Sequence, residues 1–313
     1  MNEQPIDPEV TALLGSSLAP RTPVAEITAE QMRRDMDDAV AAFTKDAAPI
    51  EVHRVVDDLV PGRGGDIPVR VYSPETPTAV IVYMHGGAWV AGGIHTHEFV
   101  TRRISRDTGA IVISVDYRML PEHPYPAPFD DAYDAVVWAS ALRPELPFIV
   151  AGDSAGGTLA ACCALLARDE DGPYIDGQVL VYPAIDADPE RPSMVAFREG
   201  GHIVLDELNH YLAQYTAPEV AHGSPYALPG YATTLEGLPP AVVVIAGHDL
   251  LRSAEEDYAR RLDDAGVPVT VQLDHELVHG WIDFAPRVAS ADRAFGRLTE
   301  AVNGLIRRAG ASS

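Results

Sequence analysis

The hydrophobic positions of this chain follow two periods, one typical of helices and one typical of strands. Near the start, two amphipathic helical patterns cover Pro8 to Leu14 and Thr28 to Thr44, joined by a turn-rich segment. Asp7 and Thr28 stand where helix N-caps are expected. From Val52 onward the pattern changes to short apolar runs that favour strands. A core sheet is therefore expected to begin there.

After that point, predicted strands and helices alternate along the chain. The expected strands are 52–59, 67–72, 79–84, 110–115, 147–151, 178–182, 240–246 and 267–273. The expected helices are 96–108, 126–142, 155–168, 206–214, 253–265 and 286–308. Such alternation predicts an α/β fold, with a mostly parallel central sheet of about eight strands and helices on both faces.

One segment, 185–223, interrupts this alternation. It is rich in Pro, Asp, Glu and His and contains a single expected helix. Long irregular segments inside compact domains are usually functional. Because ligands of parallel sheets bind beyond the carboxyl ends of the strands, we interpret the segment as an insertion over that edge.

Composition excludes several classes of function. The 313 residues carry a formal net charge of −23, which disfavours nucleic acid and anionic lipid as partners. The only cysteines, Cys162 and Cys163, are neighbours on an expected helix and predict no disulfide. No signal-peptide pattern opens the chain and no apolar run is long enough to span a membrane. We expect a cytoplasmic protein without membrane insertion.

The candidate chemistry begins at Gly152-Asp153-Ser154-Ala155-Gly156, between an expected strand and an expected helix. In this G-x-S-x-G pattern a sharp turn exposes the serine hydroxyl above the sheet. The N–H of Ala155 would then face the oxyanion that forms when Ser154 attacks a carbonyl carbon. A glycine-bearing turn without chemistry is the alternative for this motif taken alone.

A second glycine motif, His85-Gly86-Gly87, follows the expected strand 79–84. Residues without side chains allow backbone N–H groups to face a cavity, so Gly86 and Gly87 are predicted to complete an oxyanion hole. We assign His85 a supporting position, in which it orients the loop by hydrogen bonding. A flexible turn is again the alternative.

Two later strands are followed by residues that could complete a catalytic triad, Asp249 and His279. The chain order Ser, Asp, His is that of α/β-hydrolases. Asp249 would orient the imidazole of His279, which would take the proton of Ser154. Other carboxylates and imidazoles compete for these positions, namely Asp186, Asp274 and His275. No ligand spacing for a metal is present, and no cofactor is expected.

Together these motifs resemble the bacterial hormone-sensitive-lipase-like esterases and lipases of the α/β-hydrolase superfamily. The resemblance rests on segments 85–89, 116–126, 152–157, 247–252 and 279–281. It implies the α/β-hydrolase fold with a helical cap assembled from residues 1–49 and 185–223, over a core of residues 50–184 and 224–313. It also implies a supporting position for Asp153. Trp281 departs from the phenylalanine that is usual in the family.

We therefore expect a serine carboxylesterase that hydrolyses short-to-medium-chain acyl esters, with Trp89 and Trp281 limiting the space near the reacting carbon. Two alternatives use the same fold: a receptor-like module that binds a small molecule, and an amide hydrolase or elimination catalyst with the same triad. An apolar strand over 267–273 near the sheet edge suggests a homodimer.

Overall fold

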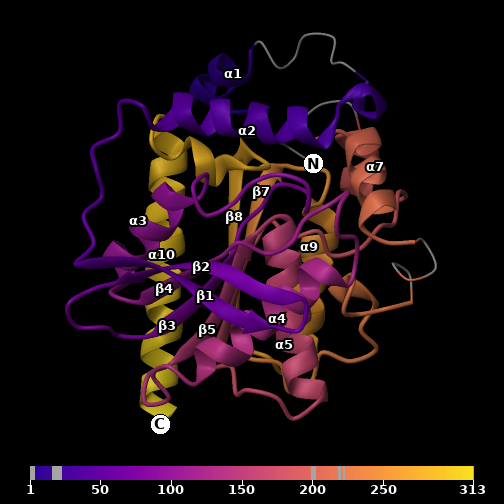
Figure 1. The fold of residues 1–313 in the computed structure, drawn as a ribbon. Coiled ribbons are helices and arrows are strands. Elements are labelled where there is room, and N and C mark those ends of the chain that lie inside the picture. The colour runs from indigo at the N-terminus through magenta and orange to yellow at the C-terminus, as the bar shows by residue number, and fades with distance from the viewer. Residues whose placement is uncertain (1–3, 16–22, 199–201, 218–219, 221–222, 313) are drawn as a thin grey trace.

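The computed structural model describes residues 4–15, 23–198, 202–217, 220 and 223–312. Its centre is one eight-stranded sheet, which runs through the middle of the molecule (Figure 1). The strands are β1 (Arg54–Gly62), β2 (Gly65–Ser73), β3 (Val80–Met84), β4 (Ile111–Val115), β5 (Phe148–Asp153), β6 (Gly177–Val181), β7 (Ala241–His248) and β8 (Val269–Val278).

The sheet has the strand order β1-β2-β4-β3-β5-β6-β7-β8. The pairs β1–β2 and β2–β4 are antiparallel, and every other pair is parallel. The expectation of a mostly parallel sheet is thus confirmed. Residues of β3, β4, β5 and β6 are buried throughout, as expected for strands that are covered on both faces.

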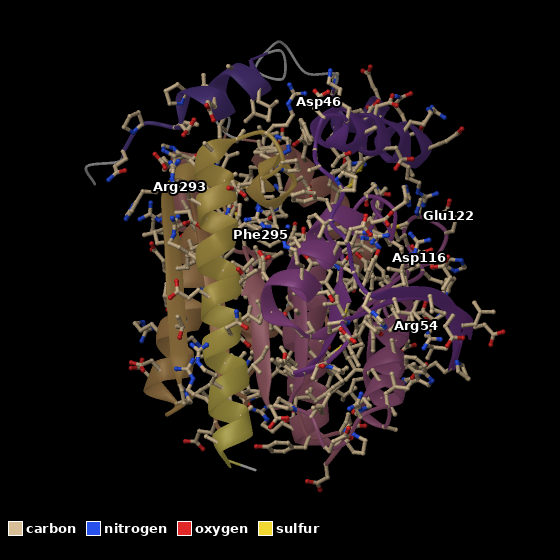
Figure 2. The ribbon with its side chains drawn as sticks, turned by 90° about the vertical axis from the view of Figure 1, so that its left-hand side faces the viewer. Asp46, Arg54, Asp116, Glu122, Arg293 and Phe295 are labelled. Atoms are coloured by element: carbon tan, nitrogen blue, oxygen red, sulfur yellow. The ribbon has the colours of Figure 1, made fainter. Side chains whose placement is uncertain are left out.

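Helices form a layer on each face of this sheet. One face carries α4 (Ala127–Ser140), α5 (Ala155–Asp169) and α9 (Arg252–Asp264), and the other carries α3 (Glu98–Thr108) and α10 (Ala289–Ser312). Alternate strand residues point to the two layers, so that Val82 belongs to one apolar cluster and Ile81 to the other. Figure 2 shows α10 alongside the sheet, with Phe295 directed at α3; there the Arg103 guanidinium lies 4.3 Å from the Phe295 ring centroid.

Three further helices lie above the carboxyl ends of the strands (Figure 1). They are α1 (Pro8–Leu14) and α2 (Ala29–Thr44) from the start of the chain and α7 (Leu205–Tyr215) from the insertion. The short elements are α6 (Pro192–Ala196), also in the insertion, and the turns η1 (Val24–Glu26), η2 (Pro229–Tyr231) and η3 (Trp281–Phe284). This arrangement is that of a cap. Parts of the expected insertion, 199–201, 218–219 and 221–222, lie outside the described residues, and the domain boundaries stay a prediction.

Most expected elements are present within a few residues of their predicted limits, but β8 differs. It continues to Val278 instead of ending at 273, because a bulge between Ala246 and His248 lets its second half keep pairing with β7. His275 therefore lies inside the strand, and His279 is the residue that follows it. The helix α6 was not predicted.

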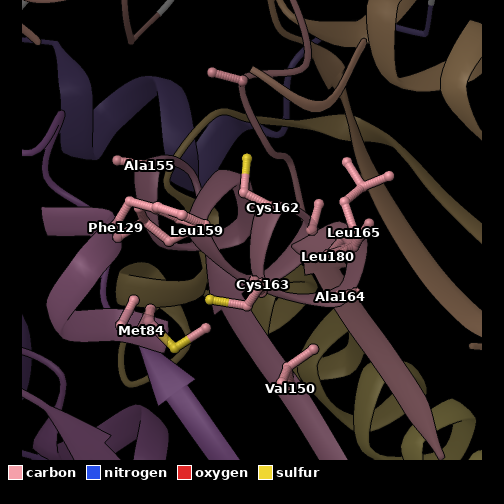
Figure 3. Packing of buried hydrophobic residues seen from close by; sticks show 14 of the residues in the cluster. Met84, Phe129, Val150, Ala155, Leu159, Cys162, Cys163, Ala164, Leu165 and Leu180 are labelled. Atoms are coloured by element: carbon pink, nitrogen blue, oxygen red, sulfur yellow. The ribbon is translucent and has the colours of Figure 1, made fainter. Parts of the chain in front are cut away.

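The edge of the sheet bears on the expected homodimer. Strand β8 is at the edge, and Val271 on it is 52% exposed. Pairing with a second copy stays a prediction. None of the described helices is long and apolar enough to cross a membrane. Cys162 and Cys163 are free, buried and directed away from each other on α5 (Figure 3).

Candidate active site

Ser154 occupies a strained turn between the end of β5 and the start of α5. Its backbone has φ 51° and ψ −123°, a region that residues with a side chain rarely adopt. The conformation is held in place because the Ser154 N–H donates to the Val181 carbonyl on the neighbouring strand at 2.8 Å. The turn is short enough to leave the hydroxyl partly exposed above the sheet.

The glycines of the motif are required by close backbone packing. A Cβ at Gly156 would lie 2.0 Å from the Met84 carbonyl oxygen and 2.5 Å from the His85 carbonyl oxygen. A Cβ at Gly152 would lie 2.4 Å from backbone atoms of Gly156. Since real side chains do not approach backbone so closely, only glycine fits at these two positions. The turn is thereby pressed against the end of β3.

The three residues predicted as a triad meet above the sheet. The His279 Nε2 atom lies 2.8 Å from Ser154 Oγ, and His279 Nδ1 lies 2.6 Å from Asp249 Oδ2. The second oxygen of Asp249 accepts from the Leu251 N–H at 2.9 Å. Because the carboxylate can only accept, Nδ1 carries the ring proton and Nε2 is free to accept the serine proton.

His279 reaches this position from the end of β8. The next residue, Gly280, has φ 73°, in the left-handed region that glycine adopts without strain. This turn brings the ring inward, where its centroid lies 4.6 Å from that of Tyr182. The ring and the Asp249 carboxylate are both buried.

The competing residues have other partners. Asp186 accepts from the Arg191 guanidinium, with a 2.5 Å contact from Oδ2 to Nη2. Asp274 is buried and accepts from Gln272 and Arg297, while His275 is exposed on β8. The geometry therefore favours Asp249 and His279.

His85 contacts the loop of residues 86–91 that follows it, which is called the glycine loop below. Burial, with a smaller effect of the charge of His97, lowers the pKa of His85 to about 3, so the ring is neutral. Its Nδ1 lies 2.7 Å from the Gly86 carbonyl and donates to it. The Tyr117 ring stacks on His85, and its hydroxyl donates to the His85 carbonyl at 2.7 Å.

The prediction that Gly86 donates to the oxyanion is wrong. Its N–H donates to Asp153 Oδ1 at 3.0 Å and is buried beneath the loop. This contact gives Asp153 its supporting position, because the residue before Ser154 holds the loop opposite Ser154. A Cβ at Gly86 would lie 2.3 Å from Asp153 Oδ2, so the motif needs glycine here for close approach.

The sequence analysis did not identify Ala88 as a candidate hydrogen-bond donor. It has φ 54°, and in the part of the chain that the structure describes, the N–H groups of Gly87, Ala88 and Ala155 have no acceptor. These three groups therefore have hydrogen-bonding capacity left for a ligand. The non-glycine residue at 88 gave no signal of its left-handed conformation, since alanine rarely adopts it.

The expected substrate contacts of Trp89 and Trp281 are also corrected. Trp89 is 2% exposed and stacks on Tyr215 of α7, with centroids 4.1 Å apart. Trp281 is fully buried in the core on the α10 face of the sheet. Neither ring presents surface to a substrate, and Trp89 instead packs the glycine loop against the cap.

An arginine of the cap holds the same loop. Arg33 of α2 donates through Nε to the Val90 carbonyl at 2.9 Å and through Nη2 to the Leu120 carbonyl at 2.6 Å. It also pairs with Glu122 at 2.7 Å. The cap and the residues after Gly87 are therefore fixed relative to each other. Sequence gave no indication of this role.

A family model described as the alpha/beta hydrolase fold matches residues 81–283. The chain belongs to this family. The α/β-hydrolase is 41% identical over 243 residues to "Carboxylesterase NlhH" of Mycobacterium tuberculosis, covering 74% of this chain and 76% of the relative. It is 29% identical over 317 residues to "Ethyl acetate hydrolase" of Pseudomonas putida, covering 95% and 98%.

Among solved structures, the α/β-hydrolase is similar to a hyperthermophilic esterase from the archaeon Pyrobaculum calidifontis. The TM-score is 0.88 with 34% identity, and the match covers 96% of this chain and 99% of that one. The resemblance to hormone-sensitive-lipase-like esterases is thus confirmed, and the protein is a carboxylic-ester hydrolase. A purely receptor-like role is not supported by these relatives. Among the described residues, no three His, Cys, Asp or Glu side chains are grouped to hold a metal ion.

The close packing at Gly156 generates a stability prediction. Gly156→Ala should lower the free energy of unfolding by about 3 kcal/mol or more, because its Cβ overlaps a backbone oxygen that cannot move aside. The matched control is Gly296→Ala on α10, where a Cβ meets nothing within 4 Å, so the expected change is a gain of about 0.5–1 kcal/mol. Urea unfolding of both variants measures the difference; equal stabilities would contradict this account.

Arg33 generates a prediction about the cap. Arg33→Met should lower kcat/KM about tenfold and speed hydrogen exchange in α2 and residues 87–91, because charged hydrogen bonds contribute about 1.5–3 kcal/mol each at most. Arg34→Met is the control, since Arg34 bonds only within α2, to Glu30 and Gln31. If the two variants behave alike, Arg33 does not anchor the loop.

Proposed function

We propose that this carboxylic-ester hydrolase acts through an acyl-enzyme on Ser154, with His279 as general base and then acid and Asp249 as the residue that orients it. The observation that carries the proposal is the unbroken hydrogen-bond chain from Ser154 Oγ through both nitrogens of His279 to Asp249. A nucleophile, a base and an orienting carboxylate within hydrogen-bond distance are the recognised requirements of this chemistry.

The first half of the reaction forms the acyl-enzyme. Ser154 Oγ attacks the ester carbonyl carbon while its proton moves to His279 Nε2, which gives a tetrahedral intermediate. Asp249 stabilises the imidazolium that results. His279 then donates the proton to the leaving alcohol oxygen as the C–O bond breaks. Water repeats the same steps on the acyl-enzyme and releases the acid and free Ser154.

The negative oxygen of each intermediate needs hydrogen-bond donors. We assign this role to the N–H groups of Gly87, Ala88 and Ala155, which lack protein acceptors within the described ranges. Ala155 also stands at the N-terminus of α5, where the helix dipole favours negative charge. Preorganised donors of this kind contribute about 3–4 kcal/mol each to the transition state.

The acyl group is proposed to be short. The name of the relative from Pseudomonas putida points to an acetyl ester. We infer an optimum between acetyl and hexanoyl esters.

Ser154→Ala tests the nucleophile. Turnover of a short ester should fall by about a millionfold, because the covalent intermediate cannot form. Circular dichroism and thermal unfolding should show that the variant is folded. Substantial remaining esterase activity in a folded variant would refute the assignment.

The choice of carboxylate is tested by a matched pair. Asp249→Asn should lower kcat by about 10⁴-fold, since an amide favours the wrong tautomer of His279. Asp186→Asn should stay within about threefold, because Asp186 is paired with Arg191 and not with the triad. Steady-state kinetics on both variants decides, and the opposite ranking would exclude Asp249.

Acyl-length preference is measured with a panel of esters from acetyl to dodecanoyl. Activity should rise while the added methylenes of the acyl chain are buried, at about 0.8 kcal/mol each, and fall once the acyl site is full. A preference of the wild-type protein for long-chain triglycerides would contradict the proposal.

A further inference from the structure

A second histidine–carboxylate pair lies beneath the glycine loop, outside the triad. His97, immediately before α3, is fully buried, and its Nε2 lies 3.3 Å from Asp153 Oδ1. The same oxygen accepts from the Tyr83 hydroxyl at 2.7 Å and from the Gly86 N–H at 3.0 Å. Asp153 therefore contacts hydrogen-bond donors from β3, the glycine loop and the start of α3. It also directly precedes Ser154 in the chain.

The hydrogen bonds around His97 indicate a doubly protonated ring. Its Nδ1 lies 2.9 Å from Thr96 Oγ1, and the Thr96 hydroxyl donates its only proton to the Gly93 carbonyl at 3.0 Å. Thr96 Oγ1 must therefore accept from Nδ1. Nε2 faces a carboxylate oxygen, which also can only accept. Both nitrogens carry protons in this arrangement, so His97 and Asp153 form a buried ion pair.

The surrounding charges agree with this assignment. Burial alone would lower the pKa of His97, but the charge and hydrogen bond of Asp153, with a smaller contribution from Asp283 of η3, raise it to about 8. Two other titratable groups face the His97 ring. The centroid of the neutral His85 ring lies 5.5 Å from that of His97, and the centroid of the Tyr83 ring lies 6.3 Å from it. Burial raises the pKa of Asp283 to about 6 and of Tyr83 well above its usual value. Near pH 7, His97 is the cation of this cluster.

We infer that His97 is a positioning residue for ester hydrolysis: its charged ring holds Asp153 on the Gly86 N–H and thereby fixes the oxyanion loop opposite Ser154. The inference rests on the proposed function, because it requires that turnover depends on the loop N–H groups. His97 touches no reacting atom. It acts through Asp153 and Gly86.

Loss of the proton from His97 has a defined consequence. The Gly86 nitrogen lies 3.4 Å from His97 Nε2, only slightly farther than from Asp153 Oδ1. A deprotonated Nε2 becomes a second acceptor for the Gly86 N–H and leaves the Asp153 charge buried without its cation. The loop that begins at Gly86 then loses its fixed position, and the donors at Gly87 and Ala88 move with it.

The direction of the pH effect follows from linkage. The pKa of His97 is raised above its ordinary 6.5 in the folded protein. The stabilisation that the protonated ring gives to the loop is therefore fully present below pH 6.5 and is lost as pH rises through about 8. The two pKa values, 6.5 and about 8, correspond to acid dissociation constants that differ by a factor of about 30. The decrease in kcat caused by deprotonation of His97 should not exceed this factor. We expect kcat to decrease about tenfold between pH 7 and pH 9.5, with little change in KM.

The experiment compares kcat and KM for a short ester from pH 6 to 10 in the wild-type protein, His97→Gln and His53→Gln. Glutamine keeps an N–H donor for Asp153 but carries no charge at any pH. His97→Gln should therefore show a lowered kcat at pH 7, an unchanged KM and no alkaline decrease. His53 is exposed, and its variant should keep the wild-type profile. Thermal unfolding at each pH shows that the proteins remain folded.

Two outcomes overturn the inference: a wild-type kcat that does not decrease between pH 7 and pH 9.5, or a decrease that persists unchanged in His97→Gln. If His97→Gln does not fold, Asp153→Asn replaces it and should also remove the alkaline decrease, because His97 then has no carboxylate to hold its proton. Ser154→Ala distinguishes a failure of the proposed function from a failure of the inferred role of His97. Its full activity would refute the proposed function, whereas an inactive Ser154→Ala with a flat wild-type profile refutes only the role of His97.

Discussion

The contact of Gly156 with the carbonyl oxygens of Met84 and His85 is the constraint on which the active site depends. It presses the β5–α5 turn against the end of β3, so Ser154 and the glycine loop share one packing surface. Ser154 is held at a positive φ because the strand before it and the helix after it are both buried. The strained backbone is thus a consequence of packing, and the exposed hydroxyl is a consequence of the strain.

Two buried carboxylates near this contact, Asp249 and Asp153, have different hydrogen-bond partners. Asp249 lies 2.6 Å from the His279 ring, whose other nitrogen is within hydrogen-bond distance of Ser154 Oγ. Asp153 lies 3.3 Å from the His97 ring and accepts from the Gly86 N–H. For Asp153, burial favours the neutral acid, yet the charge of His97 and the donors His97 and Tyr83 lower its pKa overall. The cap adds a third attachment through Arg33 and the Trp89–Tyr215 stack. The hydrogen-bonded set Ser154, His279 and Asp249 and the glycine loop are therefore held by separate contacts.

The sequence predicted the fold and singled out Ser154, Asp249 and His279, which the structure brings within hydrogen-bond distance of one another. Each of these signals is local: a strand period, a helix period, and a motif at a strand end. It failed where the answer depended on contacts between distant segments. The Gly86 N–H is used by a carboxylate 67 residues away, which no pattern near Gly86 indicates. His97 gave no signal for the same reason. Trp89 and Trp281 were placed near the substrate by proximity along the chain, but packing against Tyr215 and the α10 core decided their positions.

The central claim is that Ser154 is the activated nucleophile of this site. Its most direct test is stoichiometric inactivation with a fluorophosphonate, followed by mass spectrometry of the digested protein. The account predicts one adduct per chain, on the peptide that contains Ser154, with loss of activity in proportion to labelling. An adduct on another residue, or full labelling of Ser154 with activity retained, would contradict it.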